Sequence, residues 1–127
     1  YEFIAVLKEE AASIVQMNLG RVGGILEAKK IAAIAEASYA QVAPHMYCGP
    51  IIAAANVQVA ASISNFLIIE GIETWSGFDA SLIIDPLKWE DGYIVPSDKP
   101  GLGIEINENK LEEYPYKESK LHLEMSD

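Results

Sequence analysis

The sequence is poor in the residues that form disulfides, metal clusters and nucleic-acid contacts. It has one cysteine, Cys48, which excludes an intrachain disulfide and a cysteine-rich zinc site. The two histidines, His45 and His122, are too few for a histidine-based metal site without outside ligands. Basic residues are also scarce, since 9 Lys and Arg stand against 19 Asp and Glu and the formal net charge is −10. This charge repels polyphosphate, so we expect no nucleic-acid partner.

Long hydrophobic runs are missing as well. No apolar stretch approaches the ~20 residues that cross a bilayer, and the opening YEFIAVLKEE has neither the basic region nor the cleavage site of a signal peptide. We therefore expect a cytoplasmic protein with no membrane partner. Half of the residues are apolar and 22% are charged, which indicates a folded chain. The 127 residues suffice for one domain, but a complete eight-stranded barrel needs about twice as many, ~250.

Short apolar strands alternate with helical patterns in the first part of the chain. The predicted helices cover residues 2–12, 25–38 and 51–63, the last of them preceded by Pro50. The predicted strands are the short apolar runs 14–18, 39–44 and 66–70. This alternation is typical of parallel β/α units. Because right-handed crossovers place such strands side by side, we expect three adjacent parallel strands covered by helices.

The composition changes after residue 71. The following segment is rich in Gly, Pro and Asp, with a hairpin-like GYIVP, a strand-like GLGIEI and a polar end, YPYKESKLHLEMSD. We expect residues 1–71 to form the βα units. We expect residues 72–127 to form an irregular return segment with some β structure and a polar tail.

A polar residue stands at the carboxyl end of each predicted strand: Asn18 after IVQM, His45 after VAP, and Glu70 at the end of FLIIE. In parallel α/β folds the functional residues gather at these strand ends. Each residue taken alone has an ordinary explanation as a turn former, a structural histidine or a solvent-facing carboxylate. Their coincidence on three successive strands favours a site at one rim.

The stretch from QMNLG to FLIIE resembles the sixth to eighth barrel strands of acid-sugar dehydratases in the mandelate racemase group of the enolase superfamily. The most specific parts are GRVGGILEAKKIA, APH followed by GPI, and NFLIIE. PGLGIEI resembles the segment by which the C-terminal part of these proteins returns to their N-terminal capping domain. The resemblance as a whole covers most of residues 1–110. It implies an α/β fold, namely the C-terminal portion of a (β/α) TIM-like barrel with strands six to eight.

The resemblance also implies roles for the three rim residues. In that group a histidine on the seventh strand is an acid/base, an aspartate ending the sixth strand is its partner, and a glutamate ends the eighth. The matching residues here are His45, Asn18 and Glu70. Asn18 would orient the imidazole without supplying a charge, which leaves the basicity of His45 open. Glu70 would stabilise the substrate or intermediate by hydrogen bonding.

The implied reaction is the dehydration of a sugar acid such as gluconate or galactonate to a 2-keto-3-deoxy acid. It begins with removal of the proton α to the carboxylate, and the enediolate is held by Mg²⁺. The family's Mg²⁺ ligands come from the third to fifth strands, which we expect in a missing N-terminal part. We therefore expect this chain alone to be inactive and to bind no catalytic Mg²⁺. Glu27, Glu36 and Asp79 are available carboxylates, but Glu27 and Glu36 lie on a predicted helix, where we expect a solvated face and no metal. We also expect a homo-oligomer.

Other interpretations stay open. The same scaffold carries racemases and cycloisomerases, and a chain of this length also fits a non-catalytic fragment or assembly module. The glycines Gly20, Gly23 and Gly24 do not form a dinucleotide-binding fingerprint and favour a tight turn. A nucleophile made of Cys48 and His45, three residues apart, is a minor alternative.

Overall fold

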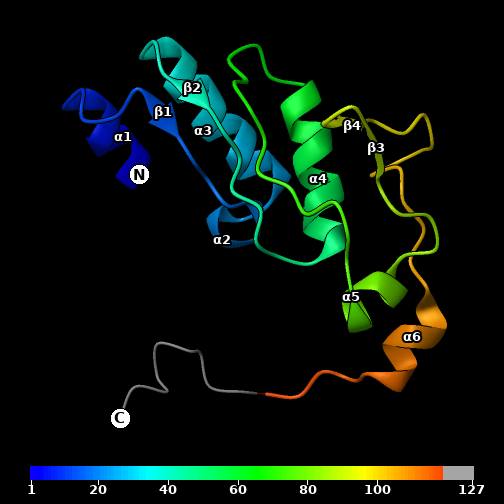
Figure 1. Ribbon diagram of the computed structural model, residues 1–127. Coiled ribbons are helices and arrows are strands. Elements are labelled where there is room, and N and C mark those ends of the chain that lie inside the picture. Colours follow the sequence, from blue (N-terminus) through cyan, green and yellow to red (C-terminus); the bar gives the residue numbers. More distant parts are fainter. Residues whose placement is uncertain (119–127) are drawn as a thin grey trace.

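The computed structural model describes residues 1–118 of the chain. Its helices are α1 (Glu2–Lys8), α2 (Leu19–Val22), α3 (Ile25–Ala37), α4 (Pro50–Ala61), α5 (Gly77–Leu82) and α6 (Glu108–Glu113). Its strands are β1 (Ile14–Val15), β2 (Gln41–Val42), β3 (Lys88–Glu90) and β4 (Tyr93–Val95). Figure 1 shows α1, β1 and β2 on one side of α4 and the β3–β4 hairpin on the other. No helix within residues 1–118 is long and apolar enough to cross a membrane.

The three predicted strands lie side by side and run in parallel. Ile14 pairs with Gln41 and Val15 with Val42, which joins β1 to β2. On its other side Val42 forms a parallel bridge to Phe66. The segment 39–44 is therefore the central strand, and the predicted parallel arrangement is confirmed.

Backbone hydrogen bonds continue this ladder past the regular strands. The N–H of His45 donates to the carbonyl of Met17 at 2.9 Å. The N–H of Glu70 donates to the carbonyl of Pro44 at 3.3 Å. The regular strands are shorter than predicted, yet these bonds carry all three segments to the same end of the sheet.

Helices α3 and α4 cover the strands with small side chains. Ala28, Ala32 and Ala35 of α3 are buried, at the spacing that places them on one helix face. Helix α4 begins at Pro50, whose missing N–H is no loss in a first turn. The core that these helices close contains Leu7, Val15, Met17, Leu19, Val42, Ala55 and Val59.

Two boundaries differ from the sequence-based expectation in the first 71 residues. Helix α1 ends at Lys8 and not at residue 12, because Glu10 takes a left-handed φ of 51° that stops the helix. The turn expected around Gly20 and Gly23 contains the four-residue helix α2, closed by Gly23 at φ 105°. The first difference removes about one turn from a helix, and the second adds a helix of one turn. Neither changes the order of the strands.

Residues 72–118 combine a hairpin with short helices. The predicted hairpin is present as β3–β4, and its two-residue turn, Asp91 and Gly92, has φ values of 49° and 81°. Positive φ at both positions is what a type I′ turn requires. Helices α5 and α6 are not predicted by the sequence pattern. The expected strand in GLGIEI is reduced to a single antiparallel bridge between Ile83 and Ile106, and residues 119–127 of the predicted tail lie outside the described residues.

The hairpin lies against the end of the third parallel segment. A Cβ on Gly71 would come within 2.7 Å of the Trp89 ring, so the indole covers this glycine directly. The hairpin and residues 66–69 line an apolar cavity of about 610 Å³. Ile68 remains 62% exposed beside it. An apolar strand surface is therefore only partly covered within the described part of the chain.

Candidate functional site

Asn18 connects the end of the first parallel segment to helix α2. It is the N-cap of that helix, with an extended backbone at φ −103° and ψ 116°. Its Oδ1 accepts a hydrogen bond from the N–H of Gly20 at 2.9 Å, which satisfies one of the free amide groups of the first turn. The side chain is nearly buried, at 8% exposure. One end of the amide is thus committed to the helix.

The other end of the Asn18 amide faces a histidine and a cysteine. Asn18 Nδ2 lies 2.8 Å from His45 Nδ1 and 3.2 Å from Cys48 Sγ. The same sulfur lies 3.7 Å from Asn18 Oδ1, in position to donate. A single side chain therefore joins the first two parallel segments and the loop that follows the second.

The backbone of His45 is held from a buried position on α4. Asn56, with no exposed surface, donates through Nδ2 to the carbonyl of His45 at 3.0 Å. Its Oδ1 is buried without a hydrogen-bond partner among the described residues. Because the His45 N–H is also bonded, to Met17, the peptide groups on both sides of the imidazole are fixed.

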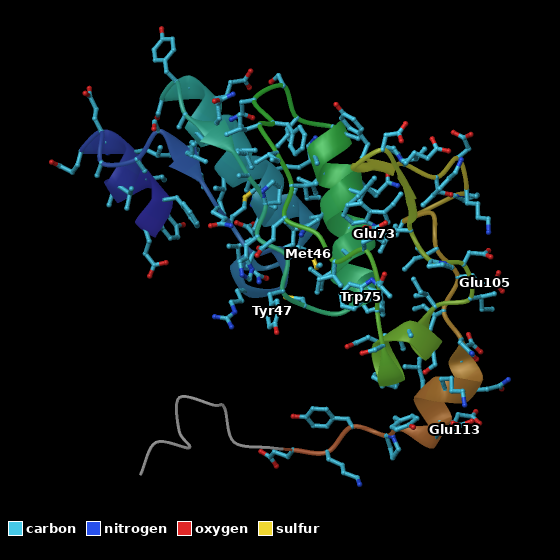
Figure 2. The ribbon with its side chains drawn as sticks, viewed as in Figure 1. Met46, Tyr47, Glu73, Trp75, Glu105 and Glu113 are labelled. Atoms are coloured by element: carbon cyan, nitrogen blue, oxygen red, sulfur yellow. The ribbon has the colours of Figure 1, made fainter. Side chains whose placement is uncertain are left out.

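Glu70 lies on the opposite side of the imidazole from Asn18. Its Oε2 accepts a hydrogen bond from the N–H of Met46 at 2.8 Å and lies 3.7 Å from His45 Nε2. The side chains of His45 and Glu70 are 35% and 43% exposed. Met46 is labelled in Figure 2 beside α4. His45 and Glu70 are thus the members of the three-residue cluster that a solute can reach.

The structure brings together all three residues that the sequence singled out, Asn18, His45 and Glu70, at one end of the parallel segments. It adds Cys48 and Asn56, whose contacts sequence reasoning missed. Asn56 did leave a signal, because it is a polar residue inside the apolar run IIAAANV. The hydrogen bonds of Cys48 are with Asn18, which gives no support to a Cys48–His45 nucleophile.

A second, more polar cavity of about 420 Å³ lies beside this cluster. Cys48 contributes to its wall, together with Tyr47, Trp75 and Asp79. Figure 2 labels Tyr47 and Trp75. The rim thus continues into a hollow that the loop after β2 and the start of the return segment form together.

The described residues do not form a metal centre by themselves. Within residues 1–118 no group of three or more His, Cys, Asp and Glu side chains is placed to hold an ion. Glu70 is a single carboxylate whose Oε2 already accepts from Met46. Glu27 pairs with Lys30 on an exposed face of α3, and Glu36 accepts from Ser64.

Two lysines of the return segment have raised pKa values. A side-chain hydrogen bond to Asp85 raises the pKa of Lys99. The corresponding bond to Glu113 raises the pKa of Lys110. Both pairs lie at the surface, where solvent screens the charges, so they contribute little to stability.

Comparison with known proteins gives a consistent set of similarities. The family model described as "Enolase C-terminal domain-like" matches residues 1–110. A D-galactonate dehydratase of Cronobacter sakazakii is 39% identical over 117 residues, which is 87% of this chain and 31% of that protein. The chain therefore spans 31% of the length of this curated relative.

Two crystal structures extend the comparison to three dimensions. A candidate mandelate racemase/muconate lactonizing enzyme from Labrenzia alexandrii is 58% identical, with a TM-score of 0.85 over 96% of this chain and 31% of that one. An enolase from Pantoea ananatis with bound D-gluconate and Mg is 29% identical, with a TM-score of 0.78 over 91% of this chain and 28% of that one.

Proposed function

The chain belongs to the enolase C-terminal domain-like family, and on that premise we propose that it is part of a Mg²⁺-dependent dehydratase of sugar acids, of the gluconate and galactonate type. The observation that carries the proposal is the meeting of Asn18, His45 and Glu70 at one rim. Further support comes from the similarity to a D-galactonate dehydratase and to an enolase that binds D-gluconate. On its own the chain would be inactive, since it spans 31% of the relative's length.

Dehydration of an aldonic acid removes the proton α to the carboxylate and expels the β-hydroxyl as water. The enol that forms rearranges to a 2-keto-3-deoxy acid. Negative charge grows on oxygen during the first step, so a catalyst must present hydrogen-bond donors or cations to that oxygen. The Mg²⁺ would supply such a cation, held by residues outside this chain.

The residues of this chain would act at the exposed side of the cluster. The His45 side chain is partly exposed and would be the acid/base group that touches the reacting atoms. Asn18 would orient the imidazole through Nδ1. Glu70, fixed by the N–H of Met46, would stabilise the substrate or intermediate by hydrogen bonding.

A racemase or cycloisomerase of the same superfamily is the second candidate. The Labrenzia alexandrii structure favours it, because that protein is described by the mandelate racemase and muconate lactonizing reactions. Dehydration and racemisation both begin with the loss of an α-proton, and they differ in the fate of the enediolate. A non-catalytic fragment or assembly module is the third candidate.

The test is an assay of the complete protein with Mg²⁺ and a panel of aldonic acids that includes gluconate and galactonate. We expect a 2-keto-3-deoxy acid to accumulate, detected as a new ketone by NMR. Inverted or cyclised products without loss of water would favour the second candidate. No product from any acid in the panel would remove the dehydratase proposal.

A further inference from the structure

The orientation of the Asn18 amide is set by the backbone. The N–H of Gly20 can only donate, so the atom that faces it at 2.9 Å must be the oxygen. An amide turned by 180° would place its NH₂ group against that N–H, and two donors would face each other. The nitrogen of Asn18 therefore points to His45 and Cys48.

This orientation decides which imidazole nitrogen carries the proton. Asn18 Nδ2 has hydrogens and no free electron pair, and it lies 2.8 Å from His45 Nδ1. Nδ1 must then accept, and in a neutral imidazole the proton stays on the other nitrogen. The second hydrogen of Nδ2 has its own acceptor in Cys48 Sγ, 3.2 Å away. Every hydrogen-bonding position of the Asn18 side chain that faces the cluster is used in this arrangement.

We propose that Asn18 is a positioning residue that holds His45 as its neutral Nε2–H tautomer, so that His45 meets the substrate as a hydrogen-bond donor and the α-proton is taken by another group. In this tautomer Nε2 has no free electron pair with which to act as a base. Nε2 lies 3.7 Å from Oε2 of Glu70, and both side chains are partly exposed. A donor at that place suits an oxygen that gains negative charge or a departing hydroxyl. A group that only donates has a more restricted role than a general acid/base. The identity of the substrate in this proposal rests on the proposed function.

Cys48 supports the same orientation without determining it. Its sulfur accepts from Nδ2 and can donate to Oδ1, so it lies against the edge of the amide. Removal of the thiol leaves the bond from Gly20, which is part of the backbone. A variant at Cys48 is thus a matched control for a variant at Asn18. Both variants change the contact between Asn18 and Cys48, but only the Asn18 variant changes the group that faces His45 Nδ1.

The test is the ¹⁵N NMR spectrum of the imidazoles in the complete protein, labelled in histidine, at neutral pH. The His45 signals are those that disappear in His45→Asn. In the wild type we expect Nε2 to be protonated and Nδ1 to be free. A proton on Nδ1, or rapid exchange between both nitrogens, would overturn the proposal without any use of substrate.

Two variants complete the experiment. In Asn18→Asp the carboxylate can only accept, so we expect the proton to move to Nδ1. In Cys48→Ala we expect the Nε2–H tautomer to persist. An unchanged tautomer in the first variant, or a reversed one in the second, would contradict the assignment. Failure of every aldonic acid to react would refute the proposed function and leave this spectroscopic result intact.

Discussion

His45 depends on residues that bind its backbone as well as its ring. Asn56 donates to the His45 carbonyl from the fully buried side of α4. We predict that Asn56→Ala lowers the free energy of unfolding by about 1–3 kcal/mol, because a buried carbonyl loses its donor. Urea denaturation of the complete protein measures this change.

The matched control is Gln58→Ala, two residues along the same helix. Its side chain makes a long 3.4 Å bond to the carbonyl of Leu102. We expect a smaller change, within about 0.5 kcal/mol. Equal losses from the two variants would mean that the bond to His45 adds nothing beyond general packing of α4.

The contribution of the His45 imidazole to catalysis can be tested by replacing it. We predict that His45→Asn lowers kcat for dehydration by about 10²–10³-fold, the usual effect of removing one donor to a developing oxyanion. The unfolding free energy should stay close to the wild-type value, since the ring is partly exposed. Glu27→Gln, on the exposed face of α3, is the control and should leave turnover unchanged. Near-normal turnover in the histidine variant would exclude His45 from the reaction.

Asn18→Asp should create a base where the wild type has a donor. With the proton drawn to Nδ1, Nε2 gains a free electron pair that faces the substrate. We predict faster exchange of the substrate α-proton with D₂O, by about tenfold or more. Mass spectrometry of recovered gluconate measures the exchange. Exchange that stays at the wild-type rate, in a variant that still folds, would show that this face of the site lacks access to the α-carbon.

The sequence predicted part of this site and not the rest, for a physical reason. Asn18, His45 and Glu70 end strands of one direction, and parallel strands bring their carboxyl ends together whatever the loops do. Cys48 lies in an irregular loop, where spacing gives no direction for a side chain. Asn56 was visible as a polar residue in an apolar helix, but the identity of its partner depends on the helix orientation.

At the scale of elements, the attachment of the hairpin to the parallel segments depends on Gly71 and Trp89. The ring lies over the glycine so closely that an added Cβ would displace it. We predict that Gly71→Ala lowers the unfolding free energy by about 1–3 kcal/mol through overpacking. In a Trp89→Ala background the same change should cost much less, because the ring is gone. A cost that is equal in both backgrounds would locate the strain in the backbone of residue 71.

The elements that were predicted and those that were missed differ in length. Helix α3 has 13 residues and shows its apolar period clearly, whereas α5 and α6 have 6 residues each. A period of 3.6 needs a window of about 11–18 residues to be recognised. The hairpin was predicted from GYIVP alone. Its turn at Asp91 and Gly92 is a strong local signal that also covers the preceding strand, β3.

At the scale of the whole molecule, the outer parallel segments each lack a strand partner on one side within the described part of the chain. Within residues 1–118, β1 pairs only with β2, and Ile14 is 49% exposed. Leu67 and Ile68 of the third segment are also exposed. In a closed barrel both edges are paired. The open edges are what part of a barrel would present.

Binding of Mg²⁺ should depend on the complete protein. We predict that the 127-residue chain alone shows no saturable Mg²⁺ binding by calorimetry at millimolar concentrations. Octahedral Mg²⁺ needs several oxygen ligands, and within residues 1–118 no group of three or more His, Cys, Asp and Glu side chains is placed to hold an ion. The complete protein should bind Mg²⁺. Tight binding by the short chain, lost in Glu70→Gln, would contradict the expectation that the ligands lie elsewhere.

The amide that faces the imidazole is also the cap of a helix, and this double use has an evolutionary consequence. Asn and Asp cap a helix about equally well, so either residue at position 18 keeps the start of α2 satisfied. A mutation between them leaves the architecture in place while it exchanges a donor for an acceptor next to His45. Selection can therefore change the proton chemistry of this rim by one substitution in a lineage, without first having to rebuild the scaffold that carries it.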